Sequence, residues 1–201
     1  GAGMARIGVY GGSFNPPHTG HVEAAFAASE CLRPDKMLII PASIPPHKEL
    51  ADGSPDANER LELTRLAFAD VPNAEVSDME ILREGKSYSI DTVRLLKRKY
   101  PQKSFAFVCG GDMLISFDKW YKYEELLREI PFIVFRREGC DGAEFDRRAE
   151  YFISLGMDLT VPTDKIPAVS STFIRNNAEK AREYLPKPIY EYIKNGGIYR
   201  V

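Results

Sequence analysis

The chain has 201 residues, of which 44% are hydrophobic and 28% are charged, a composition typical of a soluble protein with one substantial core. Its 27 lysines and arginines nearly balance its 29 aspartates and glutamates, so the net charge of -2 gives no general attraction to nucleic acid or to an anionic membrane. No apolar run approaches the roughly 20 residues that a membrane-spanning helix requires. We expect a single domain over residues 4–201, in which any phosphate binding is local.

Cysteine usage and the N-terminus both indicate a cytoplasmic protein. Cys31, Cys109 and Cys140 are odd in number and far apart, and they form no Cys-x-x-Cys pair. They are therefore predicted to be reduced thiols that act as buried apolar filler, rather than disulfide partners or zinc ligands. The N-terminus shows neither the basic flank nor the apolar core of a signal peptide, and residues 1–3 before Met4 are interpreted as the remnant of an expression tag.

In chain order, short β-rich runs alternate with segments whose apolar residues recur every three or four positions. The predicted strands are 6–10, 36–40, 104–109, 131–135 and 157–161, and the predicted helices are 20–32, 58–69, 89–100, 123–129 and 146–155. Pro55 and Asp56 mark the start of the second helix, and Tyr100-Pro101 marks the end of the third. The alternation predicts an α/β fold, a Rossmann-like doubly wound parallel sheet with helices on both faces. From Ser170 onward we expect a small helical part with two short helices, separated at Leu185-Pro186.

Two long stretches, 41–55 and 161–170, match neither pattern. Irregular segments of this length in a compact domain are more often functional than decorative. Both are therefore expected to lie near the functional site.

The segment GVYGGSFNPPHTGH, residues 8–21, follows the first predicted strand. Gly11 and Gly12 predict a sharp backbone turn with room for a ligand, and Asn15 is suited to close a turn with its side chain. The pattern is neither Gly-x-Gly-x-x-Gly nor the Walker motif. A helix is expected to begin at Thr19 or Gly20, and its free N–H groups favour an anion.

His18 and His21 are three residues apart, so both are expected on one face of that helix start. Three interpretations are open: zinc ligation, a structural role and phosphate contact. Zinc would need further ligands, yet His47 is the only other histidine and no suitable cysteine pair exists. Phosphate contact is favoured.

Two further segments contain basic residues, one at a predicted helix start and one in a predicted loop. VSSTFIR, residues 169–175, places hydroxyls at a helix start and Arg175 one turn later, which predicts a second anion cradle. The alternative is a plain serine or threonine cap with a surface arginine. IPASIPPHK, residues 40–48, carries His47 and Lys48 on a proline-stiffened loop toward the carboxyl edge of the sheet, where such folds bind ligands.

These segments carry a family resemblance. GSFNPPHTGH resembles the His-x-Gly-His motif of the nucleotidyltransferase α/β-phosphodiesterase superfamily, and VSSTFIR resembles the Ile-Ser-Ser-Thr-x-Ile-Arg motif of the adenylyltransferases. IPASIPPHK, KSYSIDT (residues 86–92) and CGGDMLISFDKW (residues 109–120) resemble segments of the bacterial nicotinate mononucleotide adenylyltransferases. The resemblance extends from Arg6 to about Tyr199 and includes five motifs in the same order.

The resemblance implies transfer of AMP from ATP to nicotinate mononucleotide, which gives nicotinate adenine dinucleotide and pyrophosphate in NAD synthesis, with Mg²⁺ accompanying ATP. The alternatives are a pantetheine-phosphate adenylyltransferase, an enzyme that prefers nicotinamide mononucleotide, and a nucleotide-binding regulator without catalysis. A cytidylyltransferase would be expected to show a different C-terminal motif. No nucleic-acid or membrane partner is expected, and whether the chain forms a homo-oligomer is left open.

The resemblance also implies the site residues. Four are expected to act on the reacting phosphates: His18, His21, Lys48 and Arg175. The residues implied to contact ATP are Gly11, Gly12, Ser13, Phe14, His18, His21, Gly110, Asp112, Ser171, Thr172 and Arg175. Those implied for the mononucleotide are Lys48, Ser89, Trp120, Tyr121 and Arg137.

Three of these assignments carry more detail. Ser89 and the backbone around Tyr121 are expected to face the nicotinate carboxylate, while Trp120 provides a flat surface for the pyridinium ring. The alternative for Trp120 is an ordinary core aromatic. The sequence does not decide whether Arg136 or Arg137 faces the site, and no protein metal site is expected.

Overall fold

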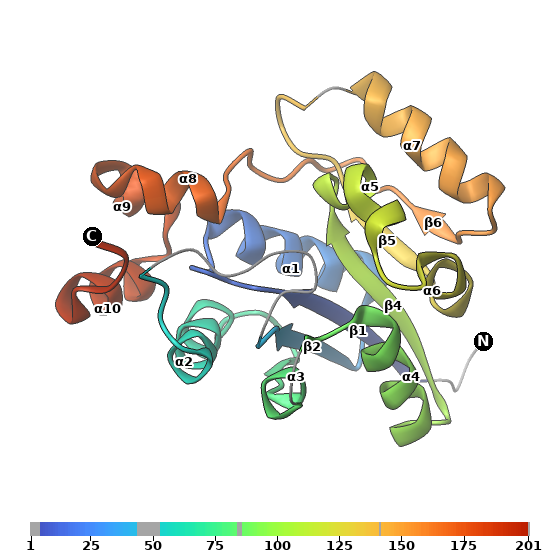
Figure 1. Ribbon diagram of the computed structural model, residues 1–201, viewed down its shortest axis with the longest axis horizontal. Coiled ribbons are helices and arrows are strands. Elements are labelled where there is room, and N and C mark those ends of the chain that lie inside the picture. The colour runs from blue at the N-terminus through green and yellow to red at the C-terminus, as the bar shows by residue number, and fades with distance from the viewer. Residues whose placement is uncertain (1–4, 44–52, 84–85, 141, 201) are drawn as a thin grey trace.

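The computed structural model describes residues 5–43, 53–83, 86–140 and 142–200 (Figure 1). The described strands form one sheet in the order β3-β2-β1-β4-β5-β6, and each strand is parallel to its neighbours. The strands are β1 (Ala5–Gly12), β2 (Lys36–Pro41), β3 (Ala74–Val76), β4 (Lys103–Gly110), β5 (Phe132–Phe135) and β6 (Leu159–Thr160). This confirms the predicted Rossmann-like α/β fold.

Helices connect the strands and complete the C-terminal part. The α-helices are α1 (Thr19–Leu32), α2 (Ala57–Ala67), α3 (Met79–Leu82), α4 (Ser89–Lys99), α5 (Asp112–Ser116), α6 (Tyr123–Glu129), α7 (Gly142–Ser154), α8 (Ser171–Asn176), α9 (Ala181–Tyr184) and α10 (Lys187–Gly196). Three short 3₁₀ helices are η1 (Phe117–Lys119), η2 (Ala178–Lys180) and η3 (Ile198–Arg200). No helix in the described ranges is long and apolar enough to cross a membrane.

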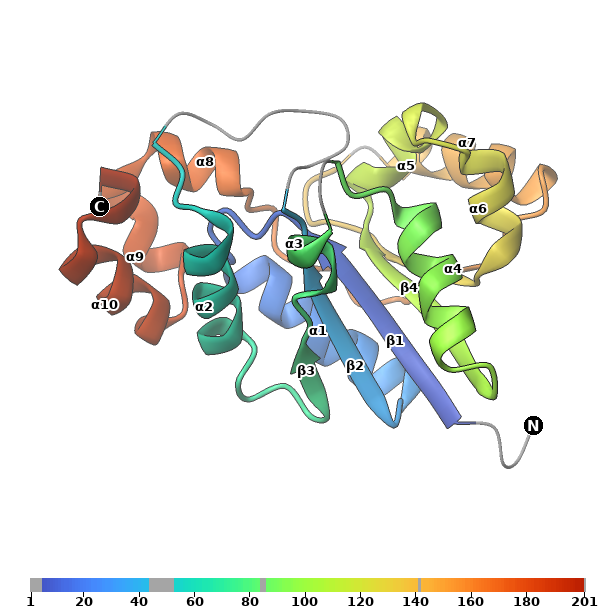
Figure 2. The same ribbon diagram turned by 60° about the horizontal axis from the view of Figure 1, so that its bottom comes forward.

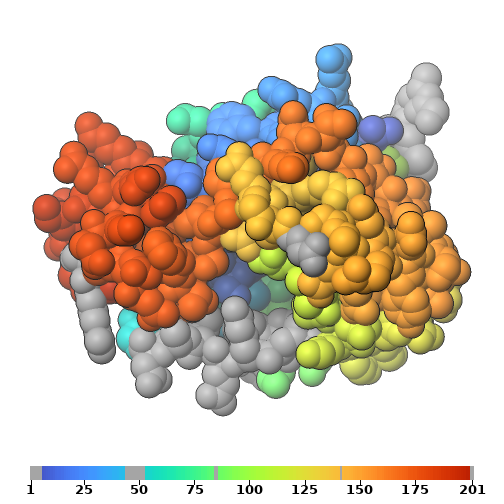
Figure 3. Space-filling model, turned by 90° about the horizontal axis from the view of Figure 1, so that it is seen from above, coloured from blue at the N-terminus to red at the C-terminus, as the bar shows by residue number. Residues whose placement is uncertain are grey.

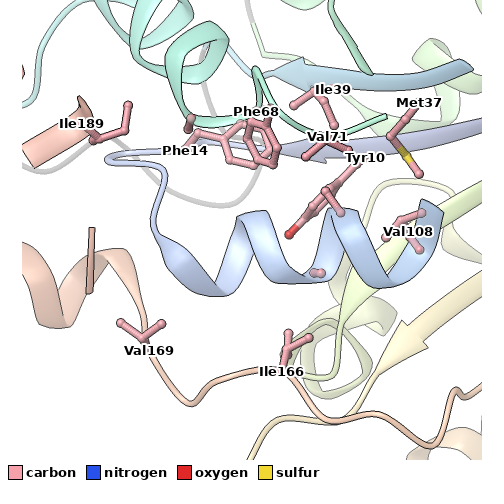
Figure 4. Packing of buried hydrophobic residues seen from close by; sticks show 14 of the residues in the cluster. Tyr10, Phe14, Met37, Ile39, Phe68, Val71, Val108, Ile166, Val169 and Ile189 are labelled. Carbon is pink, nitrogen blue, oxygen red and sulfur yellow. The ribbon is translucent and has the colours of Figure 1, made fainter. Parts of the chain in front are cut away.

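The sheet is buried on both faces by two apolar clusters. Successive residues of a strand point to opposite faces, so Val9 of β1 joins one cluster with α4, α6 and α7, while Tyr10 joins the other with α1, α2 and the C-terminal helices. Figure 2 shows α1 behind the strands, and in Figure 4 Tyr10 points from β1 toward α1. Burial on both faces explains why the strands are apolar runs rather than alternating ones.

The element predictions were largely confirmed, with shifted ends. Asp56 caps α2, because its Oδ1 accepts the Glu59 backbone N–H at 2.8 Å, and Tyr100 ends α4. Helix α7 begins at Gly142 rather than Asp146. The elements β3, α3 and α5 were not predicted, since they have three to five residues and so show no full period.

Two predictions were wrong. The C-terminal part does break at Leu185-Pro186, but η2 divides the segment before the break into α8 and α9, so it contains more than two helices. Of the three cysteines, only Cys109 is buried filler. Cys31 and Cys140 are exposed free thiols, because both lie where the chain faces solvent rather than on a core strand.

Candidate active site

A cavity of about 750 Å³ opens at the carboxyl ends of β1 and β4. The strand order reverses between these two neighbours, which is where open α/β sheets bind ligands. Figure 3 looks toward this hollow, with blue and green atoms at its floor between the red C-terminal helices and the yellow and orange segments. The same edge collects residues from segments far apart in the chain.

Most of the predicted site residues line the cavity: Gly11, Gly12, Ser13, Phe14, His18, His21, Ser89, Gly110, Asp112, Trp120, Arg137, Ser171, Thr172 and Arg175. Tyr121 is not among the lining residues; it is half exposed, with its ring against Tyr88. Lys48 lies outside the described residues. Of the two irregular stretches, 161–170 lines the cavity at Ile166, Pro167, Val169 and Ser170, whereas residues 44–52 of the other are not described.

Gly11 and Gly12 do not form the predicted sharp turn. They are the last residues of β1, paired with Ile40 and Pro41 of β2, and neither has a positive φ. The turn follows at Phe14, which has φ 47°, and the Asn15–Pro16 peptide bond is cis. At Gly11 an added Cβ would have only the Ile40 carbonyl within contact, at 3.7 Å, so this part of the cavity wall is bare backbone.

The two histidines cap the start of α1 reciprocally. His18 is the N-cap residue, and its Nδ1 accepts the His21 backbone N–H at 3.3 Å, while Nδ1 of His21 accepts the His18 backbone N–H at 3.1 Å. Their rings stack with centroids 3.6 Å apart. The expectation that both share one face of the helix start is confirmed.

Gly20 is required by this arrangement. A Cβ at residue 20 would come within 3.0 Å of the His18 ring and 3.1 Å of Val169. The histidine ring and the segment that enters α8 therefore both pack directly on the Gly20 backbone. This explains why a glycine separates the two histidines.

Both imidazoles are neutral in the folded protein. Burial, with a smaller contribution from the positive charge of Arg137, lowers the pKa of His18 to about 3, and burial together with His18 and Arg137 lowers the pKa of His21 well below its usual range. Because each Nδ1 accepts a hydrogen bond, the proton of each neutral ring must be on Nε2. The pair thus offers two N–H donors to the cavity rather than two positive charges.

The loop between β1 and α1 is fastened by C-terminal residues. Ser171 Oγ donates to the Pro16 carbonyl at 2.8 Å, and Arg175 Nη1 donates to the Asn15 carbonyl at 2.5 Å. Asn15 does not close the turn with its side chain as predicted: its Oδ1 accepts from the Tyr199 hydroxyl, and its Nδ2 donates to Ser54 Oγ at 2.7 Å. Burial of Asn15 favours these distant partners over a local turn.

The segment predicted as a second anion cradle is hydrogen-bonded to the loop of the first motif. Ser170 caps α8, with its Oγ accepting the Phe173 N–H at 3.0 Å, so the serine-cap interpretation applies to that residue. Arg175 is half buried and also donates to Thr172 Oγ1 at 3.1 Å, so it is not a free surface arginine. Both motifs meet at the cavity through these bonds.

Arg137, not Arg136, faces the cavity. Its guanidinium contacts the Asp112 carboxylate and the Val169 carbonyl, close to the histidines. Arg136 instead pairs with Asp146 at 2.6 Å and lies over the Phe145 ring. Asp112 and Arg137, predicted for different substrates, are therefore direct partners.

Polar residues that were not predicted also line the cavity. Glu80 is buried there, and its Oε2 accepts from Thr92 Oγ1 at 2.8 Å. Burial raises the pKa of Glu80, and its hydrogen bond with Thr92 opposes that shift. Since α4 starts at Ser89, its N-terminus also lies at the cavity. The one feature of the sequence that could have singled out Glu80 is its place among apolar residues in the segment Met79–Leu82.

Trp120 packs against the core and also lines the cavity. It packs against Phe107 and Phe117, with ring centroids 6.3 and 5.2 Å apart, and it is only partly buried and lines the cavity. One side of the indole is therefore held by the core, which fixes the surface that the cavity presents.

Comparisons with known proteins show the family of the chain. Residues 9–177 match the family model described as cytidylyltransferase-like. The chain therefore belongs to the cytidylyltransferase-like family. It is 39% identical, over 96% of its length and 98% of the relative, to a protein of Exiguobacterium sibiricum named "Probable nicotinate-nucleotide adenylyltransferase". It is 34% identical, over 96% of its length and 97% of the relative, to a protein of the same name from Listeria monocytogenes.

The fold has a solved counterpart. A nicotinic acid mononucleotide adenylyltransferase of Plasmodium falciparum, solved in complex with NaAD, superposes with a TM-score of 0.79 over 98% of each chain at 18% identity. At that identity the match shows the shared fold.

We expect Gly20→Ala to impair the site, because the added methyl group displaces the His18 ring or Val169. A displacement of about 1 Å at reacting phosphates lowers kcat/KM by about ten- to a hundredfold. The matched control is Gly142→Ala, where a Cβ would approach only the Arg136 side chain at 4.0 Å. Steady-state pyrophosphate release measures both, and equal activity in Gly20→Ala and wild type would contradict the packing argument.

The neutral histidines also predict a pH-dependent stability. In the unfolded chain they bind protons near pH 6.5, while in the folded chain His18 does so only near 3. The unfolded state therefore holds more protons below pH 6.5, so the free energy of unfolding falls as the pH decreases, by about 2 kcal/mol at pH 5 from His18 alone.

Urea unfolding at about pH 7.5 and pH 5 measures this loss. In a His18→Asn/His21→Asn variant the loss between the two pH values should be smaller, since the amide oxygen of asparagine caps the helix without titrating. Equal losses in the two proteins would show that the histidines do not carry this effect.

Proposed function

We propose that the chain transfers AMP from ATP to nicotinate mononucleotide, with nicotinate adenine dinucleotide and pyrophosphate as products, in NAD biosynthesis. The observation that carries this is one cavity that unites the His-x-Gly-His segment with Ser89 and Trp120 from distant parts of the chain. Full-length relatives named nicotinate-nucleotide adenylyltransferases support it over a pantetheine-phosphate adenylyltransferase. On this proposal residues 4–201 act as one nucleotidyltransferase domain.

The reaction needs no protein nucleophile and no general base. The attacking phosphate of the mononucleotide is already ionised at neutral pH. The barrier comes from bringing two anions together in line at the α-phosphorus of ATP while charge develops on pyrophosphate. Positioning and charge neutralisation are therefore the tasks of the site.

The proposed phosphate contacts divide into neutral donors and cations. His18 and His21 donate from Nε2, beside the bare backbone of Gly11 and Gly12. Arg175 and Arg137 supply positive charge at the cavity, and Lys48 is proposed to add to it near the reacting centre. Ser13, Phe14, Gly110, Asp112, Ser171 and Thr172 complete the proposed ATP contacts.

ATP is proposed to bring magnesium, which neutralises phosphate charge when bound. Within the described ranges no three histidines, cysteines, aspartates or glutamates gather in a way that would hold a metal ion. Of the acidic residues at the cavity, Asp112 is engaged by Arg137 and Glu80 by Thr92. Such a site suits an ion held through nucleotide phosphates and water.

The pyridine ring is proposed to lie against Trp120, with its carboxylate toward Ser89 and the backbone around Tyr121. The first turn of a helix offers N–H groups and a partial positive charge, and α4 begins at Ser89. Both oxygens of a carboxylate can accept hydrogen bonds from these N–H donors. An amide has only one such oxygen and would place its own N–H group against the second donor.

Replacement of His18 or His21 by alanine should lower kcat by about a hundredfold or more, because a donor to the transition-state charge is lost. Lys48→Ala should also lower kcat without unfolding the protein. Pyrophosphate release gives the rates, and thermal unfolding reports whether each variant is folded. Wild-type turnover in folded His18→Ala would overturn its assignment to the phosphates.

Nicotinate mononucleotide should be preferred over the nicotinamide form by about tenfold or more in kcat/KM, since an unpaired buried donor costs about 1–3 kcal/mol. Side-by-side assays with ATP and each of these, and with phosphopantetheine, measure the preference and test the proposed function. Preference for the amide would point to an acceptor in the cavity, and Glu80→Gln would then show whether Glu80 is that acceptor. Preference for phosphopantetheine would overturn the proposal.

A further inference from the structure

Arg60 is a buried cation that the reaction as proposed does not use. It lies on α2 and is fully buried, among the largest completely buried side chains of the described structure. None of the ion pairs found between described residues involves it; instead, backbone carbonyls accept from its guanidinium. Burying an arginine costs free energy unless its guanidinium is paired or hydrogen-bonded, so the bonds to these carbonyls are needed to keep it there.

The carbonyls that it binds belong to two different strand ends. Arg60 Nη1 donates to the Ser13 carbonyl at 2.8 Å and to the Ala42 carbonyl at 2.7 Å, and Nη2 donates to the Ser43 carbonyl at 2.9 Å. Ser13 follows β1, while Ala42 and Ser43 follow β2. The planar fork of one guanidinium thus holds the exits of two adjacent strands.

Both exits lead into segments that the proposed reaction uses. Ser13 starts the loop that ends at His18, and Ser43 directly precedes residues 44–52, which include Lys48. The Ala42 N–H also donates to the Gly12 carbonyl at 2.9 Å, so the two exits are joined to each other as well as to Arg60. Figure 1 shows α2 between α10 and β2, and Arg60 is not one of the described residues that line the cavity.

We propose that Arg60 is a positioning residue, whose guanidinium sets the relative placement of the His18 loop and the exit of β2 at Ala42 and Ser43 for in-line phosphate transfer. This rests on the proposed function. A lysine at residue 60 keeps the charge but cannot reproduce the fork, and a methionine keeps most of the length without the charge. Since the guanidinium fixes geometry rather than binding either substrate, its loss should affect kcat more than KM.

The test compares Arg60→Lys and Arg60→Met with Arg65→Met, a control on the same helix whose side chain is half exposed and pairs with Glu62. Initial rates are measured with ATP and nicotinate mononucleotide at a temperature where circular dichroism shows folded protein. In Arg60→Lys we expect kcat to fall by about tenfold or more, with both KM values within about threefold of wild type. Arg65→Met should match wild type. If Arg60→Met does not fold, Arg60→Lys decides the result.

Amide hydrogen exchange supplies a readout independent of turnover. Residues 11–18 and 42–43 should exchange faster in Arg60→Lys than in wild type, while α7, on the other face of the sheet, should be unchanged. Folded Arg60→Lys with kcat within about twofold of wild type, or with unchanged exchange in both segments, would overturn the proposal. An inactive wild type would instead contradict the proposed function and leave the exchange experiment to decide the role of Arg60.

Discussion

The site depends on how the backbone carbonyls of the loop between β1 and α1 are satisfied. An irregular loop has no regular hydrogen-bond ladder of its own, so its buried carbonyls need other partners. Side chains supply them: Arg60 binds the Ser13 carbonyl, Arg175 that of Asn15 and Ser171 that of Pro16. Because these partners lie 47 to 160 residues along the chain, the conformation of the loop depends on tertiary contacts with α2 and α8.

The two histidines at the end of this loop are neutral hydrogen-bond donors. Reciprocal capping uses both Nδ1 atoms, and burial beside Arg137 disfavours a second proton on either ring. On the proposed function, the donors are therefore oriented before ATP binds, so that little reorganisation is needed as charge develops. Positive charge at the described part of the cavity comes from Arg137 and Arg175, each of which also holds a piece of backbone. Positioning and charge are thus carried by the same arginines.

The sequence predicted the fold well because its signals are local. Alternating apolar runs and helical periods recur over five or more residues, and Asp56 or Tyr100-Pro101 mark ends through their own backbone chemistry. The site geometry could not be predicted in the same way. Nothing near Gly12 shows that β1 continues through it, and nothing near Arg60 shows that its partners are Ser13 and Ala42. Such contacts depend on tertiary packing, which a single sequence does not display.

The cavity is lined by parts of the fold that are far apart in the chain. Residues of the β1–α1 loop and of α8 line it together with Glu80 of α3, Ser89 and Thr92 of α4, and Trp120. On the proposed function, the β1–α1 loop and α8 meet the phosphates, which every nucleoside triphosphate shares, while the other residues meet the part of the acceptor substrate that differs. Glu80 of α3 and Thr92 of α4 are hydrogen-bonded to each other, whereas His18 and His21 cap α1. On this proposal, changes at Glu80, Ser89, Thr92 or Trp120 would alter the choice of acceptor while the histidine loop keeps its own hydrogen bonds.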